Sequence, residues 1–293
     1  CLITGSTGFV GSNLVVRLID EGFFVHIIIR KESKLNLLDK VIDKVKIYYY
    51  DESIDSLLSV MKKVKPEIVF HLASLFVSEH KKVDIDRLIN SNLLFGTQLL
   101  EAMRENGVKK IVNTGTSWQH YNSENYNPVN LYAATKQAFE DMLRFYIEAY
   151  DMQAITLKLF DTYGPNDNRK KIIHLLMEAA RTGKVLEMSP GEQVIDLMYI
   201  DDVIDHYIIA LDIIYKKNSR YNETYAVASD QPVTLKALVK LIGEVTESKL
   251  NIKWGERSYR EREVMSIWKG NNMPNFQAKI DLKSGIKKCY YES

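Results

Sequence analysis

The chain has 293 residues, of which 46% are hydrophobic and 26% charged, a balance typical of a globular protein large enough to bury its own core. Its formal net charge of +1 argues against the general electrostatic attraction that nucleic acids and anionic membranes require. Two cysteines, Cys1 and Cys289, predict no disulfide framework and favour a reducing cytoplasmic location. No apolar run approaches the roughly 20 residues of a membrane helix, and six scattered histidines predict no metal site.

The first half of the chain alternates between strand-like and helical patterns. In chain order we expect strand 2–3, helix 9–21, strand 23–30, strand 45–50, helix 54–64, strand 67–71, helix 84–106, strand 108–113, helix 131–150 and strand 154–159. Such alternation predicts an α/β protein with a parallel sheet and right-handed crossovers.

Beyond residue 164 the pattern becomes mixed. In chain order we expect helix 171–181, an extended segment 194–200, helix 202–215, strand 224–228, helix 235–245, strand 251–254 and helix 281–290. We expect residues 1–164, with roughly 194–228, to form the sheet domain, and 165–193 with 229–293 to form a smaller lobe beside its carboxyl edge. The chain would then cross between the two more than once.

A glycine-rich turn joins the first predicted strand to the first predicted helix. Gly5, Gly8 and Gly11 have the spacing in which one glycine permits the bend, one lets the backbone approach a pyrophosphate and one allows close helix–strand packing. Phosphates bind the free amides at the helix N-terminus. The alternative, an ordinary glycine-containing turn, is disfavoured by the strand–helix–strand context. We therefore predict a nicotinamide dinucleotide site with these contacts: Gly5, Ser6, Thr7, Gly8, Phe9, Val10 and Gly11.

The end of the second predicted strand indicates which dinucleotide is bound. An acidic residue there binds the adenosine ribose of NAD, whereas this chain carries Arg30, followed by Ser33 and Lys34. Because arginine suits phosphate geometry, we expect Arg30 to meet a 2′-phosphate and to favour NADP, with NAD as the alternative. The competing interpretation is a solvated basic loop. Asp51, after the third strand, is a candidate acceptor for the adenine amino group, or else a helix N-cap.

Tyr132 and Lys136 are a candidate acid/base pair. They lie four residues apart on a predicted helix, so both project from one face. We expect the ammonium group to lower the pKa of Tyr132, which could then exchange a proton with a carbonyl or alcohol during hydride transfer. With 17 tyrosines in the chain, such a spacing also arises by chance. Thr116 adds to the pattern, because it stands at the carboxyl end of the preceding strand, where doubly wound sheets bind ligands.

Motifs of one family follow in order along nearly the whole chain. They are Thr4 to Gly11, His71-Leu72-Ala73, Asn92 before Gly96-Thr97, Thr116, Tyr132-Ala-Ala-Thr-Lys136, Leu159 to Pro165 and Tyr199 to Val203. By these motifs the chain resembles the extended short-chain dehydrogenases/reductases, the nucleotide-sugar epimerases, dehydratases and reductases. The resemblance implies a Rossmann-type doubly wound parallel sheet with a smaller mixed α/β C-terminal substrate lobe. It also implies a homodimer through helices 84–106 and 131–150.

The resemblance assigns roles to single residues. It makes Thr116, Tyr132 and Lys136 the catalytic triad, in which Thr116 binds the substrate oxygen and Lys136 the nicotinamide ribose. Arg260 resembles the late arginine that pairs with the substrate diphosphate. The further cofactor contacts that it implies are Leu72, Ala73, Ser74, Asn92, Thr114 and Leu159. The implied substrate contacts are Thr116, Ser117, Trp118, Asp161, Arg169 and Arg260.

Two positions depart from the family's pattern. Ile195 stands where an arginine usually precedes the aspartate, so one diphosphate contact is lost or is supplied by Arg169 or Arg262. Asp161 or Thr162 stands where the family has an asparagine, and a carboxylate is unfavourable near a diphosphate. These changes leave the sugar and its nucleotide open.

The residues after Thr116 discriminate between the reactions of the family. Dehydratases carry an Asp-Glu pair there, whereas this chain has Ser117-Trp118, which disfavours 4,6-dehydration. Arg30 favours a reductase that consumes NADPH, and the chain looks most like the CDP-4-keto-6-deoxyglucose reductases of the CDP-abequose/paratose synthase type. The alternatives are a nucleotide-sugar epimerase with retained NAD(P) and a non-catalytic cofactor-sensing binding protein, which would not need the complete triad.

Overall fold

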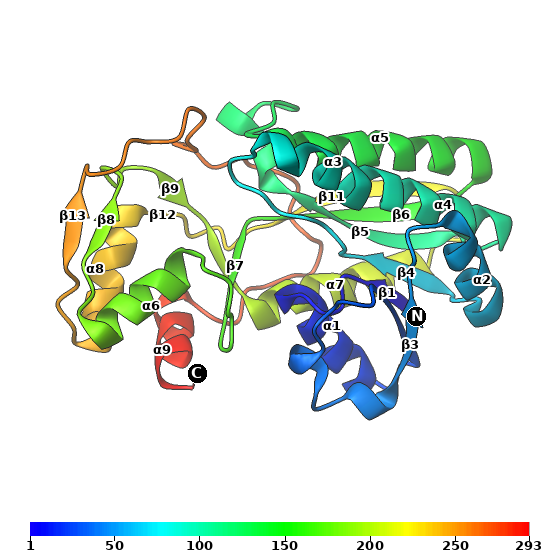
Figure 1. The fold of residues 1–293 in the computed structure, drawn as a ribbon, viewed down its shortest axis with the longest axis horizontal. Helices are drawn as coiled ribbons and strands as arrows, with labels where there is room; N and C mark the ends of the chain where they lie inside the picture. Colours follow the sequence, from blue (N-terminus) through cyan, green and yellow to red (C-terminus); the bar gives the residue numbers. More distant parts are fainter. Residues whose placement is uncertain (293) are drawn as a thin grey trace.

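A seven-stranded sheet is the centre of the computed structural model, which describes residues 1–292. Its strands all pair in parallel, in the order β11-β6-β5-β4-β1-β2-β3 (Figure 1). They are β1 (Leu2–Thr4), β2 (Val25–Ile29), β3 (Val45–Tyr49), β4 (Ile68–His71), β5 (Lys110–Thr116), β6 (Gln153–Leu159) and β11 (Tyr221–Val227). The parallel order confirms the predicted Rossmann-type α/β fold.

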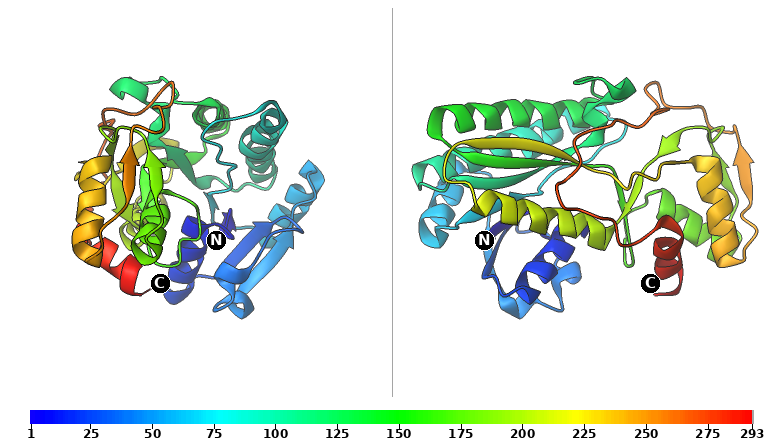
Figure 2. Two further views of the ribbon diagram at one scale, coloured as in Figure 1. Left: turned by 60° about the vertical axis from the view of Figure 1, so that its left-hand side comes forward. Right: turned by 180° about the vertical axis from the view of Figure 1, so that it is seen from behind.

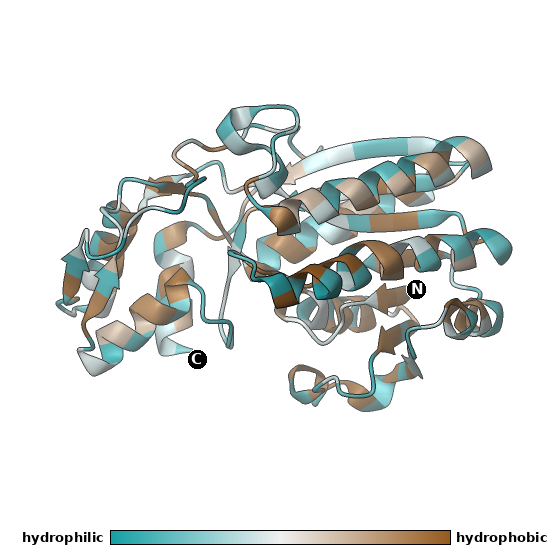
Figure 3. Cartoon of the chain, turned by 45° about the horizontal axis from the view of Figure 1, so that its top comes forward, coloured by the Kyte–Doolittle hydropathy of each residue, from teal (hydrophilic) through white to brown (hydrophobic). Residues whose placement is uncertain are grey.

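Helices cover both faces of this sheet. One face carries α1 and α7, and the other carries α2, α4 and α5. Their bounds are α1 (Phe9–Asp20), α2 (Ile54–Val64), α4 (Phe95–Glu105), α5 (Leu131–Tyr150) and α7 (Ile200–Tyr215). Figure 3 shows the strands beside the N-terminus as apolar and the helices as a mixture of apolar and polar residues, as expected for amphipathic helices on a buried sheet.

The helix expected over residues 84–106 is present but is not uniform. It consists of the 3₁₀ turn η3 (Lys82–Asp84), α3 (Ile85–Ile89), a π-helical segment (Asn90–Leu94) and then α4. π-helical turns within α-helices are often found at functional sites. Here the π-helical segment contains Asn92, which is buried.

A smaller part of the molecule lies beyond the carboxyl edge of the sheet (Figure 1). Its helices are α6 (Ile172–Thr182), α8 (Leu235–Thr246) and α9 (Leu282–Tyr291). Outside the large sheet, the short strands form three pairs, which are β7 (Asp161–Tyr163) with β10 (Leu197–Tyr199), β8 (Leu186–Met188) with β13 (Ile252–Trp254), and β9 (Val194–Ile195) with β12 (Val233–Thr234). The sequence did not predict β7, β8 and β12, because two or three residues are too few to show a period of two.

The segment between β13 and α9 returns from the smaller part to the large sheet. Figure 2 shows it crossing the molecule in orange to red. Asn272 forms a parallel bridge with Ala226 of β11. The carboxylate of Asp202 accepts hydrogen bonds from the backbone N–H groups of Lys279 (3.0 Å) and Ile280 (3.1 Å). Within residues 1–292, none of the helices has both the length and the apolar character of a membrane span.

Candidate active site

The carboxyl ends of four neighbouring strands bring the predicted site residues to one edge of the sheet. Thr4 at the end of β1 pairs with His71 at the end of β4, and Thr116 at the end of β5 pairs with Leu159 at the end of β6. The loops that begin at these four positions therefore lie side by side. This is the edge at which open α/β sheets bind their ligands.

The glycine-rich turn closes tightly on itself and on the loop after β4. Gly5 has a φ of +72°, and a Cβ there would lie 2.5 Å from the backbone N of Ala73. A Cβ on Gly11 would lie only 2.1 Å from the carbonyl oxygen of Gly5. Gly8 precedes α1 without any side-chain cap, so the amides of the first turn stay free for an anion. This cradle fits the pyrophosphate of a dinucleotide.

Thr4 and His71 fix the position of the loop after β4. The hydroxyl of Thr4 lies 2.9 Å from Nδ1 of His71 and accepts a hydrogen bond from the N–H of Ala73 at 3.3 Å. Burial, together with the positive charge of Lys136, lowers the pKa of His71 to about 3. His71 is therefore neutral and structural, and it holds Leu72 and Ala73 against the glycine turn.

Asn92 holds the next stretch of the same loop. Its Oδ1 accepts from the N–H of Leu75 (2.7 Å) and the hydroxyl of Ser74 (3.2 Å), and its Nδ2 donates to the carbonyl of Leu75 (3.0 Å) and the hydroxyl of Thr135 (2.9 Å). All of its hydrogen-bonding groups are thus used within the protein. The structure places Asn92 as a support of the loop rather than as a surface group for a cofactor.

Tyr132 meets Thr116 at the start of α5, and Lys136 follows about one turn later on the same helix. Burial raises the pKa of Tyr132 to about 12, although hydrogen bonds with the hydroxyls of Ser74 and Thr116 act in the opposite direction. The expected lowering by Lys136 is therefore not found: desolvation of the phenolate is the largest cause of the shift, and the hydroxyls of Ser74 and Thr116, not Lys136, oppose it. Lys136 is itself only 1% exposed, and burial lowers its pKa to about 8. Its Nζ has no hydrogen-bond partner among the described residues.

The other predicted cofactor residues lie along the same edge. Thr114 shares a 2.7 Å hydrogen bond with the hydroxyl of Tyr207, and Leu159 is half-buried at the end of β6. Ser6 is fully buried, and its hydroxyl lacks a partner within the described chain. Thr7 and Val10 remain partly exposed on the turn.

Arg30 directly follows β2 and is open to solvent. Its side chain is 62% exposed and lies 3.1 Å from Glu32, while its N–H donates to the hydroxyl of Ser33 at 3.1 Å. Lys34 is exposed in the same loop. The loop therefore presents a basic group at the end of β2 and is shaped by its own hydrogen bonds.

Asp51 is occupied by a neighbouring serine. Its Oδ1 accepts hydrogen bonds from the N–H (3.1 Å) and the hydroxyl (2.6 Å) of Ser53. Ser53 is the N-cap of α2, with its hydroxyl accepting from the N–H of Ser56. The interpretation of Asp51 as the N-cap was therefore wrong, because the N-cap position of α2 is two residues later, at Ser53.

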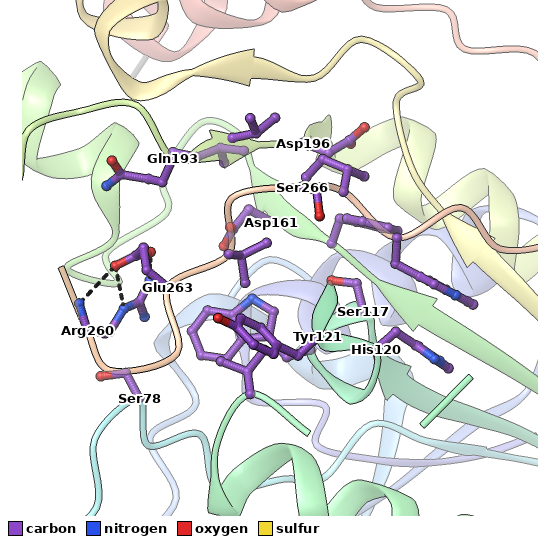
Figure 4. Close-up of a pocket in the computed structure, with 18 of the residues that line it drawn as sticks. Ser78, Ser117, His120, Tyr121, Asp161, Gln193, Asp196, Arg260, Glu263 and Ser266 are labelled. Carbon is purple, nitrogen blue, oxygen red and sulfur yellow. Dashed lines mark hydrogen bonds and ion pairs between the residues drawn. The ribbon is translucent and has the colours of Figure 1, made fainter. Parts of the chain in front are cut away.

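A cavity of about 300 Å³ opens between the sheet edge and the smaller part (Figure 4). Its wall includes the aromatic residues Phe76, Trp118, Tyr121, Phe160 and Trp268. The ring of Phe76 lies 5.5 Å from that of Trp118 and 5.0 Å from that of Tyr132, with which it makes an edge-on contact. The cavity therefore adjoins the predicted acid/base residue. Sequence reasoning missed Phe76 and Trp268, which belong to loops without a recognisable motif.

Two pairs of oppositely charged residues line the cavity. Lys171 lies 3.1 Å from Asp161, so the carboxylate of Asp161 is balanced by a cation. Arg260 makes a bidentate contact with Glu263 (2.7 and 3.2 Å) and stacks 5.0 Å above Trp118. Figure 4 shows Arg260 and Glu263 on one side of the cavity and His120 on the other.

Neither candidate substitute for the missing arginine lines this cavity. Arg169 donates to Asp167 and Thr162 and lies 4.5 Å above the ring of Phe9, on the side of the glycine turn. Arg262 stacks at 4.3 Å on Tyr121 and donates to Asn127. Ile195 does line the cavity. The structure thus leaves Arg260 and Lys171 as the cations of the cavity wall within residues 1–292.

Comparisons with known proteins agree with this arrangement. A family model described as the NAD dependent epimerase/dehydratase family matches residues 1–228. CDP-abequose synthase of Yersinia pseudotuberculosis is 30% identical over 290 residues, which cover 97% of both chains. UDP-glucose 4-epimerase of Mycolicibacterium smegmatis is 30% identical over 230 residues, which cover 71% of this chain and 72% of the relative. The solved structure of UDP-glucose 4-epimerase of Thermotoga maritima with UDP-glucose gives a TM-score of 0.85 at 23% identity, covering 99% of this chain and 98% of that one.

These matches confirm the resemblance that the motifs suggested. Within the described residues, no group of three or more metal-ligating side chains accompanies the site. The fold, the cradle for a dinucleotide and the adjoining cavity are those of an NAD(P)-dependent enzyme. The chain belongs to the NAD dependent epimerase/dehydratase family and is a nucleotide-sugar-modifying enzyme of that family.

Proposed function

We propose that the protein is an NADP(H)-dependent reductase of a nucleotide-linked 4-keto-6-deoxysugar. The observation that carries this proposal is the similarity to CDP-abequose synthase over 97% of both chains, including the smaller part that contributes half of the cavity wall. Ser117 and Trp118 support it, because they stand where a dehydratase needs two acidic groups. Arg30 supports NADPH as the reductant, since a guanidinium group at the end of β2 suits a 2′-phosphate.

The cofactor would lie across the edge formed by β1, β4 and β5 and would supply a hydride. In this proposal the turn from Gly5 to Gly11 holds its pyrophosphate, and Arg30 with Ser33 and Lys34 holds the 2′-phosphate. Leu72, Ala73 and Ser74, supported by Asn92, line the nicotinamide ribose. Further residues assigned to this site are Asp51, Thr114, Lys136 and Leu159.

Tyr132 is suited to donate the proton. Because burial raises its pKa to about 12, the phenol keeps its proton at neutral pH until the substrate oxygen gains negative charge. In the proposed reaction Thr116 donates a hydrogen bond to that oxygen, which stabilises the developing charge. Lys136, buried beside them, favours the phenolate that is left after proton transfer.

The sugar nucleotide would occupy the aromatic cavity, between the two expected domains. One is the sheet domain (residues 1–164 with 194–228), and the other is the smaller lobe (residues 165–193 with 229–293). Ser117, Trp118 and Asp161 are placed for the sugar. Arg260 is the proposed partner of the diphosphate, which would replace the carboxylate of Glu263 on the guanidinium group. Arg169 is no longer part of the proposed substrate site, since it lies against Phe9.

The experiment that tests this function is an assay of NADPH and NADH oxidation with a panel of nucleotide 4-keto-6-deoxysugars. Tyr132→Phe removes the proposed proton donor and retains the ring. We expect turnover to fall by at least about 100-fold, the scale of general acid catalysis, with the dissociation constant of NADPH nearly unchanged. Unchanged turnover in this variant would refute the proposed role of Tyr132.

A nucleotide-sugar epimerase is the second candidate, favoured by the 30% identity to UDP-glucose 4-epimerase. An epimerase returns the hydride to the sugar and keeps its cofactor, whereas a reductase consumes one NADPH for each product. Measuring cofactor consumption against product formation separates the two. Tightly retained cofactor with no net consumption would select the epimerase.

A further inference from the structure

A buried ion pair lies behind the proposed catalytic turn. We propose that Lys158 and His120 are positioning residues, which connect the turn of Thr116 to Trp268 in the cavity wall. This inference rests on the proposed function, because it concerns the same cavity. Lys158 is a buried residue of β6, and burying a charged group costs free energy unless other groups pair with it. Its partners therefore indicate its role.

The network begins at the backbone of Thr116. The N–H of Thr116 donates to Oε1 of Gln119 at 3.0 Å. Gln119 is fully buried, and its Nε2 donates to Oε1 of Glu140 at 2.9 Å. A Cβ on Gly115 would lie 2.8 Å from that same oxygen, so glycine at this position gives the carboxylate room. Nε2 of Gln119 also donates to Oε1 of Gln137 at 2.8 Å, so Glu140 and Gln137 together hold the side chain that binds the N–H of Thr116.

Lys158 joins this carboxylate to a histidine. Its Nζ lies 3.3 Å from Oε2 of Glu140 and 2.8 Å from Nε2 of His120. Because an ammonium group only donates, Nε2 of His120 is the acceptor, and Nδ1 carries the hydrogen that is donated to the carbonyl of Glu124 at 2.9 Å. Burial and the charge of Lys158 lower the pKa of His120 to about 4, in agreement with this neutral form.

The histidine ring in turn supports Trp268. The two rings are stacked, with centroids 3.9 Å apart and an angle of 7° between their planes. Trp268 comes from the returning segment between β13 and α9, and both rings line the cavity. The ammonium group of Lys158 also lies 5.8 Å from the centre of the indole ring. Because both ring nitrogens of His120 are held, the histidine offers Trp268 a platform of fixed orientation.

These contacts connect the two sides of the cavity. One end of the network holds the N–H of Thr116, which lies beside the proposed reacting carbonyl, and the other end holds an aromatic wall supplied by the smaller part. Loss of Lys158 would leave Glu140 and His120 without their shared donor. We expect the sugar to bind less tightly, because Trp268 is no longer held, and the proton to be transferred more slowly, because Thr116 is no longer oriented.

The test compares Lys158→Met with the conservative Lys158→Arg. For Lys158→Met we expect a rise of about 10-fold or more in KM for the nucleotide sugar, because the wall that binds it is no longer held, and a smaller fall in kcat. The dissociation constant of NADPH should stay within about two-fold, and Lys158→Arg should restore KM. The fluorescence of Trp268 is obtained by subtracting the signal of the matching protein that carries Trp268→Phe. Its quenching by acrylamide should increase in Lys158→Met.

Two further variants separate positioning from general stability. Lys110→Met removes a partly buried lysine from the neighbouring strand, where its Nζ donates to the carbonyl of Tyr215, and should leave KM and the quenching unchanged. His120→Phe keeps a ring against Trp268 but loses both nitrogen contacts. It replaces Lys158→Met in the test if that variant does not fold. Unchanged KM and quenching in a folded Lys158→Met or His120→Phe protein would overturn the inference. If the wild type turns over no nucleotide sugar, the proposed function fails, whereas the quenching experiment still decides the positioning role.

Discussion

The carbonyl oxygen of Gly5 lies where a side chain on Gly11 would begin, 2.1 Å from an ideal Cβ. We therefore expect Gly11→Ala to displace the glycine turn, to destabilise the protein by about 1–3 kcal/mol and to abolish cofactor binding. Gly8→Ala is the matched control for stability, since its Cβ would lie at an ordinary 3.4 Å from the same oxygen. Urea unfolding of the cofactor-free proteins measures the difference, and equal losses in the two variants would contradict it.

Lys136 should destabilise the cofactor-free protein at neutral pH. Its pKa of about 8 in the fold lies below the ordinary 10.5, so below pH 8 the folded chain must keep a buried charge that costs up to about 3 kcal/mol. Between pH 8 and 10.5 the native state releases this proton while the unfolded chain retains it, and the cost disappears. We expect Lys136→Met to be inactive but more stable than wild type at pH 7, with a smaller difference at pH 10.

The control for this prediction is Lys240→Met, which replaces an exposed lysine of α8. Its free energy of unfolding should stay close to that of the wild type at both pH values, because an exposed lysine has no desolvation cost. Urea titrations at pH 7 and pH 10 supply all the values. A Lys136→Met protein less stable than wild type at pH 7 would contradict the prediction, because it would show that the buried ammonium group stabilises the fold.

Arg30 should distinguish NADPH from NADH. Because its exposed guanidinium group, which contacts only the equally exposed Glu32, can form charge-assisted hydrogen bonds to a 2′-phosphate, we expect Arg30→Ala to raise the dissociation constant of NADPH by about 10-fold or more. The affinity for NADH should change little. Fluorescence titration with both nucleotides tests this, and Lys31→Ala controls for the loss of one positive charge from the same loop. Equal weakening of NADPH and NADH would argue against the assigned 2′-phosphate contact.

Exposed apolar side chains on α3 and α5 should form a homodimer interface. Ile85 and Ile89 of α3 and Met142 and Phe145 of α5 are exposed, Phe145 by 56%, on helices that contact each other. Exposed apolar side chains on two adjacent helices make this face a candidate interaction surface. We expect the double variant Met142→Lys with Phe145→Arg to be monomeric and folded in sedimentation experiments. Phe24→Arg, which changes an exposed aromatic residue before β2, should keep the wild-type state. A wild type that is monomeric at all concentrations would exclude the dimer.

Patterns local in the sequence predicted much of the fold and the centre of the site. The bounds of α2 and α5 agree with the predicted ranges, because regular spacing over 11 and 20 residues identifies a helix without tertiary information. The glycine spacing and the four-residue step from Tyr132 to Lys136 are local in the same sense.

Tertiary structure alone decided which side chains meet. Phe76 and Trp268 share one cavity wall although 191 intervening residues separate them in the numbering, and Arg260 is paired with Glu263 rather than free. The direction of the Tyr132 pKa also depended on burial, which the helical spacing does not reveal. The sequence by itself determined the Rossmann-type sheet and the glycine-rich turn and predicted the acid/base pair, because each follows from neighbours along the chain. The wall of the cavity and the network from Thr116 to Trp268 depend on loops that meet only when the two parts of the fold pack together.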